Sequence, residues 1–129
     1  MKNLRRYRKK ADQFVVAIQV SLETAGFTYH KWGGEQRCKP GDWLVNNSGD
    51  VYTIDGDVFQ RTYKKIAPGR YVKVTPVWAT KATQAGSVAT KEGTSQYRAG
   101  DYLVYNHKDG TDAYCVTSEK FESMYVLDE

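Results

Sequence analysis

The sequence predicts a mainly β protein of the α+β kind, made of two pseudo-symmetric antiparallel units that are barrel- or sandwich-like and are each closed by a short helix. The first observation behind this prediction is a repeated segment, KPGDWLVNN at residues 39–47 and RAGDYLVYN at residues 98–106, whose matching residues lie 59 positions apart. The second is a succession of short apolar or alternating stretches with turn-forming residues about every 8–12 positions, which is typical of antiparallel strands.

The repeat continues beyond this segment. DVYT at residues 50–53 corresponds to DAYC at 112–115, and VFQRTY at 58–63 corresponds to KFESMY at 120–125, now at an offset of 62. We therefore divide the chain into a basic arm (1–12), a first repeat (13–67) and a second repeat (68–129). The repeats are expected to form one compact domain, because a unit of about 60 residues buries too little surface to be stable alone.

The first repeat predicts five strands followed by a helix. Apolar, β-branched or alternating side chains mark the strands, which we place at residues 14–22, 27–32, 35–39, 43–45 and 51–54. The turns between them are rich in glycine, proline, asparagine and serine. Asp57 is expected to cap a short helix in which Phe59 and Tyr63, four positions apart, share one face.

The second repeat follows the same plan. Its strands are expected at residues 71–78, 87–91, 102–105 and 113–117, and its helix at 118–125 with Ser118 as the cap. A polar stretch at 79–86 allows a helical turn that ends at Gly86. Residues 1–12 have no periodicity and predict a mobile basic arm, or a segment that becomes ordered only by packing.

Composition narrows the class of protein. A hydrophobic content of 40% with 13% aromatic residues is enough for a globular core. The net charge is +4, but six basic residues fall within the first ten positions, so the charge describes a tail and argues against nucleic acid as a partner. No stretch approaches the ~18 apolar residues of a membrane span, and no signal-peptide pattern occurs, so a cytoplasmic location is expected.

The two cysteines do not point to a cofactor. Cys38 and Cys115 fall at different places in the two repeats and lack metal-ligand spacing, so they are interpreted as ordinary buried thiols. The chain also has no phosphate loop, no dinucleotide-binding glycine pattern and no Ser/His/Asp or Cys/His order. We therefore expect no cofactor, no metal and no enzymatic activity.

The repeated segments resemble a known family. KPGDWLV at residues 39–45 and AGDYLV at 99–104, followed by Asp112-x-Tyr114, are similar to the small bacterial and phage domain family named for its Pro-Gly-Asp-Tyr-Gly motif. Trp43 replaces the tyrosine in the first copy, and leucines replace the final glycine in both copies. The family has no established enzyme activity. The resemblance implies a non-enzymatic protein of a bacterium or of a phage-infected host cell.

Charged residues at strand ends are the first candidates for a ligand site. Lys91 and Glu92 lie beside a glycine, where Lys91 could meet a phosphate and Glu92 a ribose hydroxyl or an amine. The alternative is a solvated hairpin tip. The first copy keeps Lys31 but has Gly33 where Glu92 falls, so the two copies would not be equivalent. Asp101, like its repeat counterpart, either fixes the turn through backbone N–H bonds or binds a ligand hydroxyl.

Aromatic residues form the second set of candidates. Stacking surfaces for a base are expected at Trp32, Trp43, Tyr97 and Tyr102, with Trp78 and Tyr114 as further candidates; Tyr114, like Tyr52, also suits the core or an interface. Core packing explains alternate members of this set equally well, since aromatic side chains are also typical of buried strands.

Two functions follow from these features. The leading hypothesis is non-enzymatic binding of a small anionic, nucleotide-like ligand, for example the sequestration of a nucleotide-derived immune signal of the host by a phage protein. The alternative is a protein-interaction module that inhibits or adapts a host or virion protein, with the basic arm contributing to capture. Self-association into a homo-oligomer is left open by the sequence.

Overall fold

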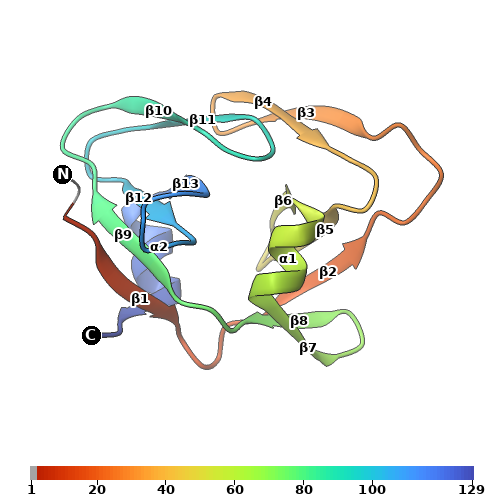
Figure 1. The fold of residues 1–129 in the computed structure, drawn as a ribbon, viewed down its shortest axis with the longest axis horizontal. Coiled ribbons are helices and arrows are strands. Elements are labelled where there is room, and N and C mark those ends of the chain that lie inside the picture. Colours follow the sequence, from red (N-terminus) through yellow and green to blue (C-terminus); the bar gives the residue numbers. More distant parts are fainter. Residues whose placement is uncertain (1–2) are drawn as a thin grey trace.

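The computed structural model describes residues 3–129, which form two units side by side (Figure 1). It confirms the predicted fold class: the chain is mainly β, with two five-stranded antiparallel sheets, two hairpins and two short helices. We call the two large sheets sheet A and sheet B.

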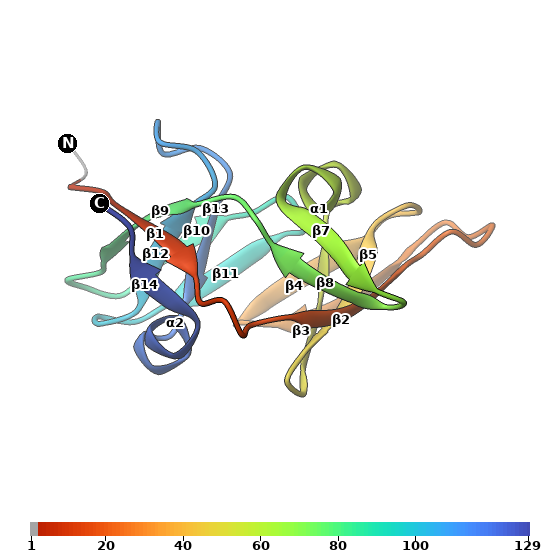
Figure 2. The same ribbon diagram turned by 90° about the horizontal axis from the view of Figure 1, so that it is seen from below.

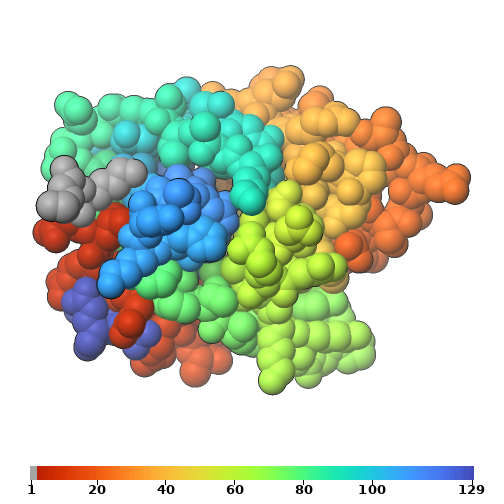
Figure 3. Space-filling view, viewed as in Figure 1, coloured from red at the N-terminus to blue at the C-terminus, as the bar shows by residue number. Residues whose placement is uncertain are grey.

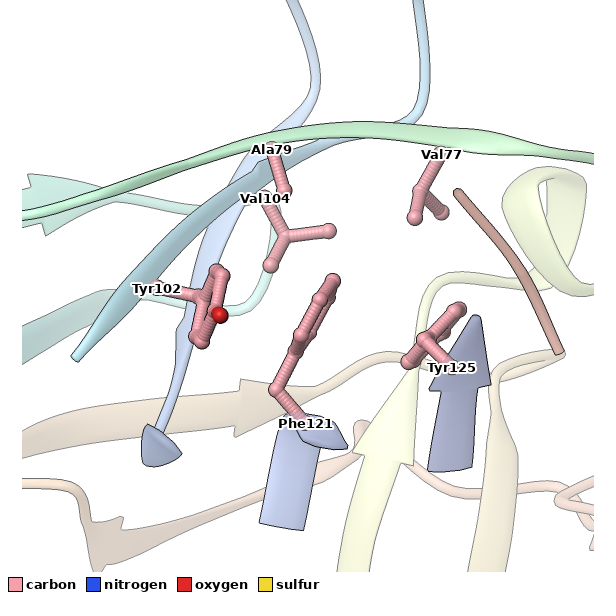
Figure 4. Close-up of a cluster of buried hydrophobic side chains, with 6 residues drawn as sticks. All are labelled: Val77, Ala79, Tyr102, Val104, Phe121 and Tyr125. Atoms are coloured by element: carbon pink, nitrogen blue, oxygen red, sulfur yellow. The ribbon is translucent and has the colours of Figure 1, made fainter. Parts of the chain in front are cut away.

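Sheet A is covered by a helix from the second repeat. In spatial order its strands are β13 (Ala113–Val116), β12 (Tyr102–Tyr105), β9 (Val77–Lys81), β1 (Arg5–Lys9) and β14 (Tyr125–Leu127). Helix α2 (Ser118–Met124) places Phe121 against this sheet. Figure 4 shows Phe121 between the side chains of β9, β12 and β14.

Sheet B has the same plan and takes four of its five strands from the first repeat. In spatial order its strands are β6 (Asp50–Ile54), β5 (Trp43–Asn47), β2 (Val15–Gln19), β8 (Arg70–Lys73) and β7 (Tyr63–Ala67). Helix α1 (Gly56–Thr62) places Phe59 against it. The two cores also match in residue type, because each contains two valines, one alanine and one phenylalanine at equivalent positions.

The two repeats exchange strands once the arm, which contains β1, is counted as part of the first repeat. Strands β1 and β2 are neighbours in the sequence, but β1 pairs in sheet A and β2 in sheet B, while β8 and β9 do the reverse (Figure 2). The registers are equivalent, since Tyr7 pairs with Val77 and Tyr71 pairs with Val15. Each sheet therefore needs a strand from the other repeat, and neither unit is complete by itself.

The two hairpins meet along one side of the molecule. One contains β3 (Phe27–Lys31) and β4 (Gly34–Cys38), and the other β10 (Gly86–Ala89) and β11 (Thr94–Tyr97). The buried Gln36 donates from Nε2 to the Thr94 carbonyl over 2.7 Å, which joins the hairpins. Glycine is required at the contact, because a Cβ at Gly93 would lie 2.0 Å from the Glu35 carbonyl oxygen.

The predicted basic arm is part of the fold. Residues 1–2 lie outside the described part, but Arg5–Lys9 forms β1 between β9 and β14. The expectation of a mobile arm is therefore wrong for these residues, and the alternative of order through packing holds. Its charges are also engaged, since Arg5 pairs with Glu129 at 3.1 Å and Arg6 with Asp128 at 3.6 Å.

The segment predicted as one strand at residues 71–78 contributes to two. Strand β8 ends at Lys73, strand β9 begins at Val77, and Pro76 lies between them. Proline has no N–H for a strand ladder, so the break falls where the chain leaves sheet B for sheet A.

Three smaller expectations also change. The helical turn expected at residues 79–86 is wrong, because its first residues continue strand β9 and the rest is not helical. Helix α1 is capped by Asp55 and not by Asp57, and the Asp55 carboxylate accepts a 3.2 Å bond from a backbone N–H of the first turn. The N-cap of α2 is Thr117 and not Ser118.

Candidate functional site

A cavity of about 480 Å³ lies between the two repeats. Its lining comes from β1, β8, both helices, the two hairpins and the edge strands of both sheets, which are β6, β7, β13 and β14. In Figure 3 the two lobes meet along a seam between the blue segment near residue 110 and the yellow-green helix α1. The volume falls in the range of roughly 300–1,000 Å³ that is typical of small-molecule sites.

Lys9 and Lys73 occupy equivalent positions at this cavity. Lys9 pairs with Tyr125 in sheet A, and Lys73 pairs with Tyr63 in sheet B. Both lysines stand on the exchanged strands, β1 and β8, so each repeat supplies its lysine to the sheet of the other. The pair therefore exists only because the strands are exchanged.

The ammonium group of Lys73 is held by neutral oxygens. Its Nζ donates to Asn106 Oδ1 over 2.9 Å and to the Tyr114 hydroxyl over 3.1 Å. It also lies 5.3 Å from the centre of the Tyr114 ring, within reach of a cation–π interaction. These contacts cross from sheet B to sheet A, so Lys73 ties the two units together at the cavity.

Lys9 has a weaker hydrogen-bond acceptor beside it than Lys73 has. Its Nζ lies 3.7 Å from the sulfur of Met124 and 5.5 Å from the centre of the Tyr125 ring. Asn47 also donates to the Met124 sulfur, over 3.2 Å. Thr62 takes the place of Met124 in the first repeat, so the thioether is what distinguishes the Lys9 end of the cavity.

Burial lowers the pKa of both lysines, because it disfavours the charged form. It lowers the pKa of Lys73 to about 7, helped by the nearby charge of Lys9 and opposed by Asp112. It lowers the pKa of Lys9 to about 8. Among residues 3–129, neither ammonium forms an ion pair with a carboxylate. An anion that entered the cavity would favour the charged form of both.

Four tyrosines surround the lysines as two equivalent pairs. Tyr52 and Tyr114 lie opposite matching valines in β5 and β12, and Tyr63 and Tyr125 follow the two helices. Burial raises the pKa of all four, that of Tyr52 to about 12. The hydroxyls therefore stay protonated at neutral pH and are able to donate hydrogen bonds to a ligand.

The carboxylates at the cavity already have partners. Asp50 binds Lys31 at 2.8 Å and Lys120 at 3.1 Å. Asp112 accepts a 2.9 Å bond from the Asn106 amide. Neither carboxylate forms an ion pair with Lys9 or Lys73, although the charge of Asp112 acts on Lys73.

Three of the predicted ligand residues reach this cavity. Trp32, Glu92 and Asp101 contribute to its lining, as does the further stacking candidate Tyr114. Glu92 accepts a 2.7 Å bond from the backbone N–H of Asp55 at the start of α1, and burial raises the pKa of its carboxyl. Trp32 lies with its ring centre 5.6 Å from that of Tyr52.

The other predicted residues are placed elsewhere. Trp43 and Tyr102 stack on the helix phenylalanines, 4.2 and 4.1 Å between ring centres, so they serve as core side chains and not as a base platform. Tyr97 stands against Gly86 in the β10–β11 hairpin. Lys91 is exposed at the tip of that hairpin, and Lys31 is engaged with Asp50 at the rim.

The aspartates of the two Gly-Asp pairs fix their turns, which is one of the two roles that the sequence allowed. Asp42 accepts bonds from the Lys39 and Gly56 backbone N–H groups over 2.8 and 3.0 Å, and Asp101 accepts one from the Arg98 N–H over 2.9 Å. The matching bonds explain why both repeats keep this pair of residues.

The lysines were missed in the sequence analysis although a signal existed. Arg6-Tyr7-x-Lys9 corresponds to Arg70-Tyr71-x-Lys73 at an offset of 64, which differs from the two offsets of the main repeat. The short match lies in the segment treated as an arm. Its meaning depends on the strand exchange, which the local sequence does not show.

No known protein family, curated protein or solved structure matches this chain. The resemblance to the Pro-Gly-Asp-Tyr-Gly family stays a prediction from the sequence. In the described part of the chain, neither helix has the length and apolar character needed to cross a bilayer. Histidine, cysteine and acidic side chains form no cluster of three suited to a metal ion within residues 3–129.

Proposed function

We propose that the chain binds a small anionic, nucleotide-like ligand in the cavity between its repeats and holds it without turnover. The supporting observation is the pair of ammonium groups, Lys9 and Lys73, at one cavity without a carboxylate partner among residues 3–129. A buried charge is costly unless an opposite charge accompanies it. An anionic ligand supplies that charge to both lysines.

The aromatic lining favours a ligand that also carries a base. The four tyrosines offer hydroxyls that remain donors, and Trp32 adds an indole for stacking next to Tyr52, whereas Tyr63 and Tyr125 already stack on the helix phenylalanines. The Glu92 carboxylate is able to accept a bond from a ribose hydroxyl or an amine. Such a site needs only to bind its ligand tightly to sequester it, for example as a nucleotide-derived signal of an infected host.

The first experiment is to purify the protein natively, record its ultraviolet absorbance spectrum and analyse by mass spectrometry what heat denaturation releases. The second is calorimetric titration with the released compound or, if none is found, with purine and pyrimidine nucleotides. We expect the double variant K9M/K73M to lose affinity by at least about 100-fold, because two hydrogen bonds to charged groups contribute about 1.5–3 kcal/mol each.

The variant K65M is the matched control, because Lys65 is an exposed lysine of β7 outside the cavity. Its affinity should equal that of the unmodified protein. The melting temperature of the double variant is measured in parallel, and K9Q/K73Q replaces it if the loss of the Lys73 hydrogen bonds lowers that temperature. Unchanged affinity in K9M/K73M would refute the site.

A second function has one observation in its favour. The outer face of sheet B exposes Val16, Ile18 and Leu44 at 48%, 67% and 38%, and Ile18 and Leu44 are paired across neighbouring strands. An apolar patch of this kind suits a protein partner. Deletion of residues 1–10 is no clean test of this alternative, because it removes strand β1 together with Lys9.

A further inference from the structure

We propose that the ligand carries two separate anionic groups, one placed at Lys9 and the other at Lys73. This inference rests on the proposed function and specifies its ligand class. It is argued from the pseudo-symmetry of the cavity, the position of the two ammonium groups and the difference between their surroundings.

The cavity lies where the two repeats meet, so its polar groups occur twice. Each lysine is accompanied by an asparagine from the end of the strand next to a sheet edge, Asn47 in β5 and Asn106 just after β12. A tyrosine opposite each of these strands completes the set, as the shared register shows. A site with duplicated donors is complementary to a ligand with duplicated acceptors.

A single anionic group leaves one ammonium unpaired. The two charges already disfavour each other, because Lys9 helps to lower the pKa of Lys73. A ligand with one anionic group removes this cost at one lysine only, whereas a second anionic group removes it at the other. Nearby carboxylates form no ion pair with either lysine among residues 3–129: Asp50 is bound by Lys31 and Lys120, and Asp112 acts on Lys73 only through its charge.

The two ends also differ enough to set the orientation of an unsymmetrical ligand. Lys73 is fixed in place by the Asn106 amide and the Tyr114 hydroxyl, at 2.9 and 3.1 Å. Lys9 has the Met124 sulfur at 3.7 Å, a much weaker acceptor. Lys73 is the more preorganised of the two cations. Lys9 has more freedom to follow a ligand group.

The test compares three probes by titration calorimetry. They are adenosine monophosphate, an adenosine bisphosphate with its phosphates on opposite sides of the ribose, and a cyclic dinucleotide, in which two phosphodiester groups join the two nucleosides. Each is titrated into the full chain, K9M, K73M, the double variant and the control K65M. We expect at least one two-anion probe to bind 10-fold or more tightly than adenosine monophosphate.

The single variants give the decisive result. For a ligand that contacts both lysines, K9M and K73M should each lower affinity about 10- to 100-fold, and the double variant should bind more weakly than either single variant. A ligand with one anionic group is able to use either lysine, so each single variant should change its affinity less than about 3-fold. Should K9M or K73M lower the melting temperature, K9Q and K73Q replace them.

The two proposals fail in different ways. If none of the anions binds, the proposed function fails and the inference with it. If adenosine monophosphate binds as tightly as the two-anion probes, with single variants that barely matter, the cavity binds anions but the two-group inference is wrong. If only one lysine matters for every probe, the cavity holds a single anion and the inference is again wrong.

Discussion

The two repeats agree in their cores and differ at their shared cavity. Phe59 and Phe121 are each 1% exposed and face equivalent valines and alanines, so interior packing is nearly the same in both units. At the cavity, by contrast, Met124 replaces Thr62, and Glu92 has no carboxylate counterpart in the first hairpin. Packing limits what a core position tolerates. A cavity wall is free to acquire separate chemistry at each end.

The largest effects should come from breaking the cores. We expect F59A and F121A each to lower the free energy of unfolding by about 3–5 kcal/mol, because each leaves a buried void. Urea titration followed by tryptophan fluorescence and circular dichroism should show a single transition in both variants, since the exchanged strands β1 and β8 make each sheet depend on both repeats.

The matched control is L22A, whose leucine is 74% exposed and should cost less than about 0.5 kcal/mol. A two-step transition in F121A, with the first repeat still folded after the second has melted, would contradict the mutual dependence of the two units.

The aspartates of the two Gly-Asp turns should contribute unequally to stability, and their loss should cost less than the loss of a core phenylalanine. Asp42 accepts from two backbone N–H groups and from the Lys39 ammonium, whereas Asp101 accepts from one backbone N–H. We expect D42A to cost about 1–3 kcal/mol and D101A about 1 kcal/mol in chemical denaturation. Equal losses would mean that the extra bonds of Asp42, including the one to the start of α1, contribute nothing to stability.

A further effect should be a pH dependence that originates at the cavity. The folded-state pKa values of Lys73 and Lys9, about 7 and about 8, lie below the ordinary lysine value of 10.5. The unfolded chain therefore binds more protons, and the free energy of unfolding should increase as the pH rises through this window, by at most about 1.4 kcal/mol per pH unit for each lysine.

Urea denaturation across the neutral to mildly alkaline range should show this increase in the unmodified protein and in K65M, and a shallower one in K73M. The measurement stays below the ordinary thiol pKa of 9.0, because burial raises the pKa of both Cys38 and Cys115 and their titration opposes the trend. An identical slope in K73M would show that Lys73 is not desolvated.

Much of the fold was visible in the sequence because it is encoded locally. The KPGDWLV and AGDYLV segments predicted equivalent turns and strands, and Asp42 and Asp101 do fix those turns. The aromatic residues four positions apart, Phe59 and Tyr63, predicted a short helix that is present as α1. Turn chemistry and side-chain periodicity act over a few residues, so they can be recognised without knowledge of the tertiary structure.

The candidate site was visible only in part. Trp32, Glu92 and Asp101 were expected to bind a ligand and do reach the cavity, whereas Trp43 and Tyr102 became core residues. An aromatic side chain in a strand suits a core and a binding surface equally well. Its role is decided by the element that packs against it, here a phenylalanine from the helix of the same repeat.

The sequence by itself determined the duplicated architecture, the mainly β class and the chemistry of each turn. The tertiary structure alone decided that β1 and β8 cross to the opposite sheets, and hence that Lys9 and Lys73 share a cavity with four tyrosines. The physical reason is that local pattern specifies a strand but not its partner. Which sheet a strand joins depends on pairing between residues far apart in the chain, and the two nearly identical sheets offer the same pattern to either strand.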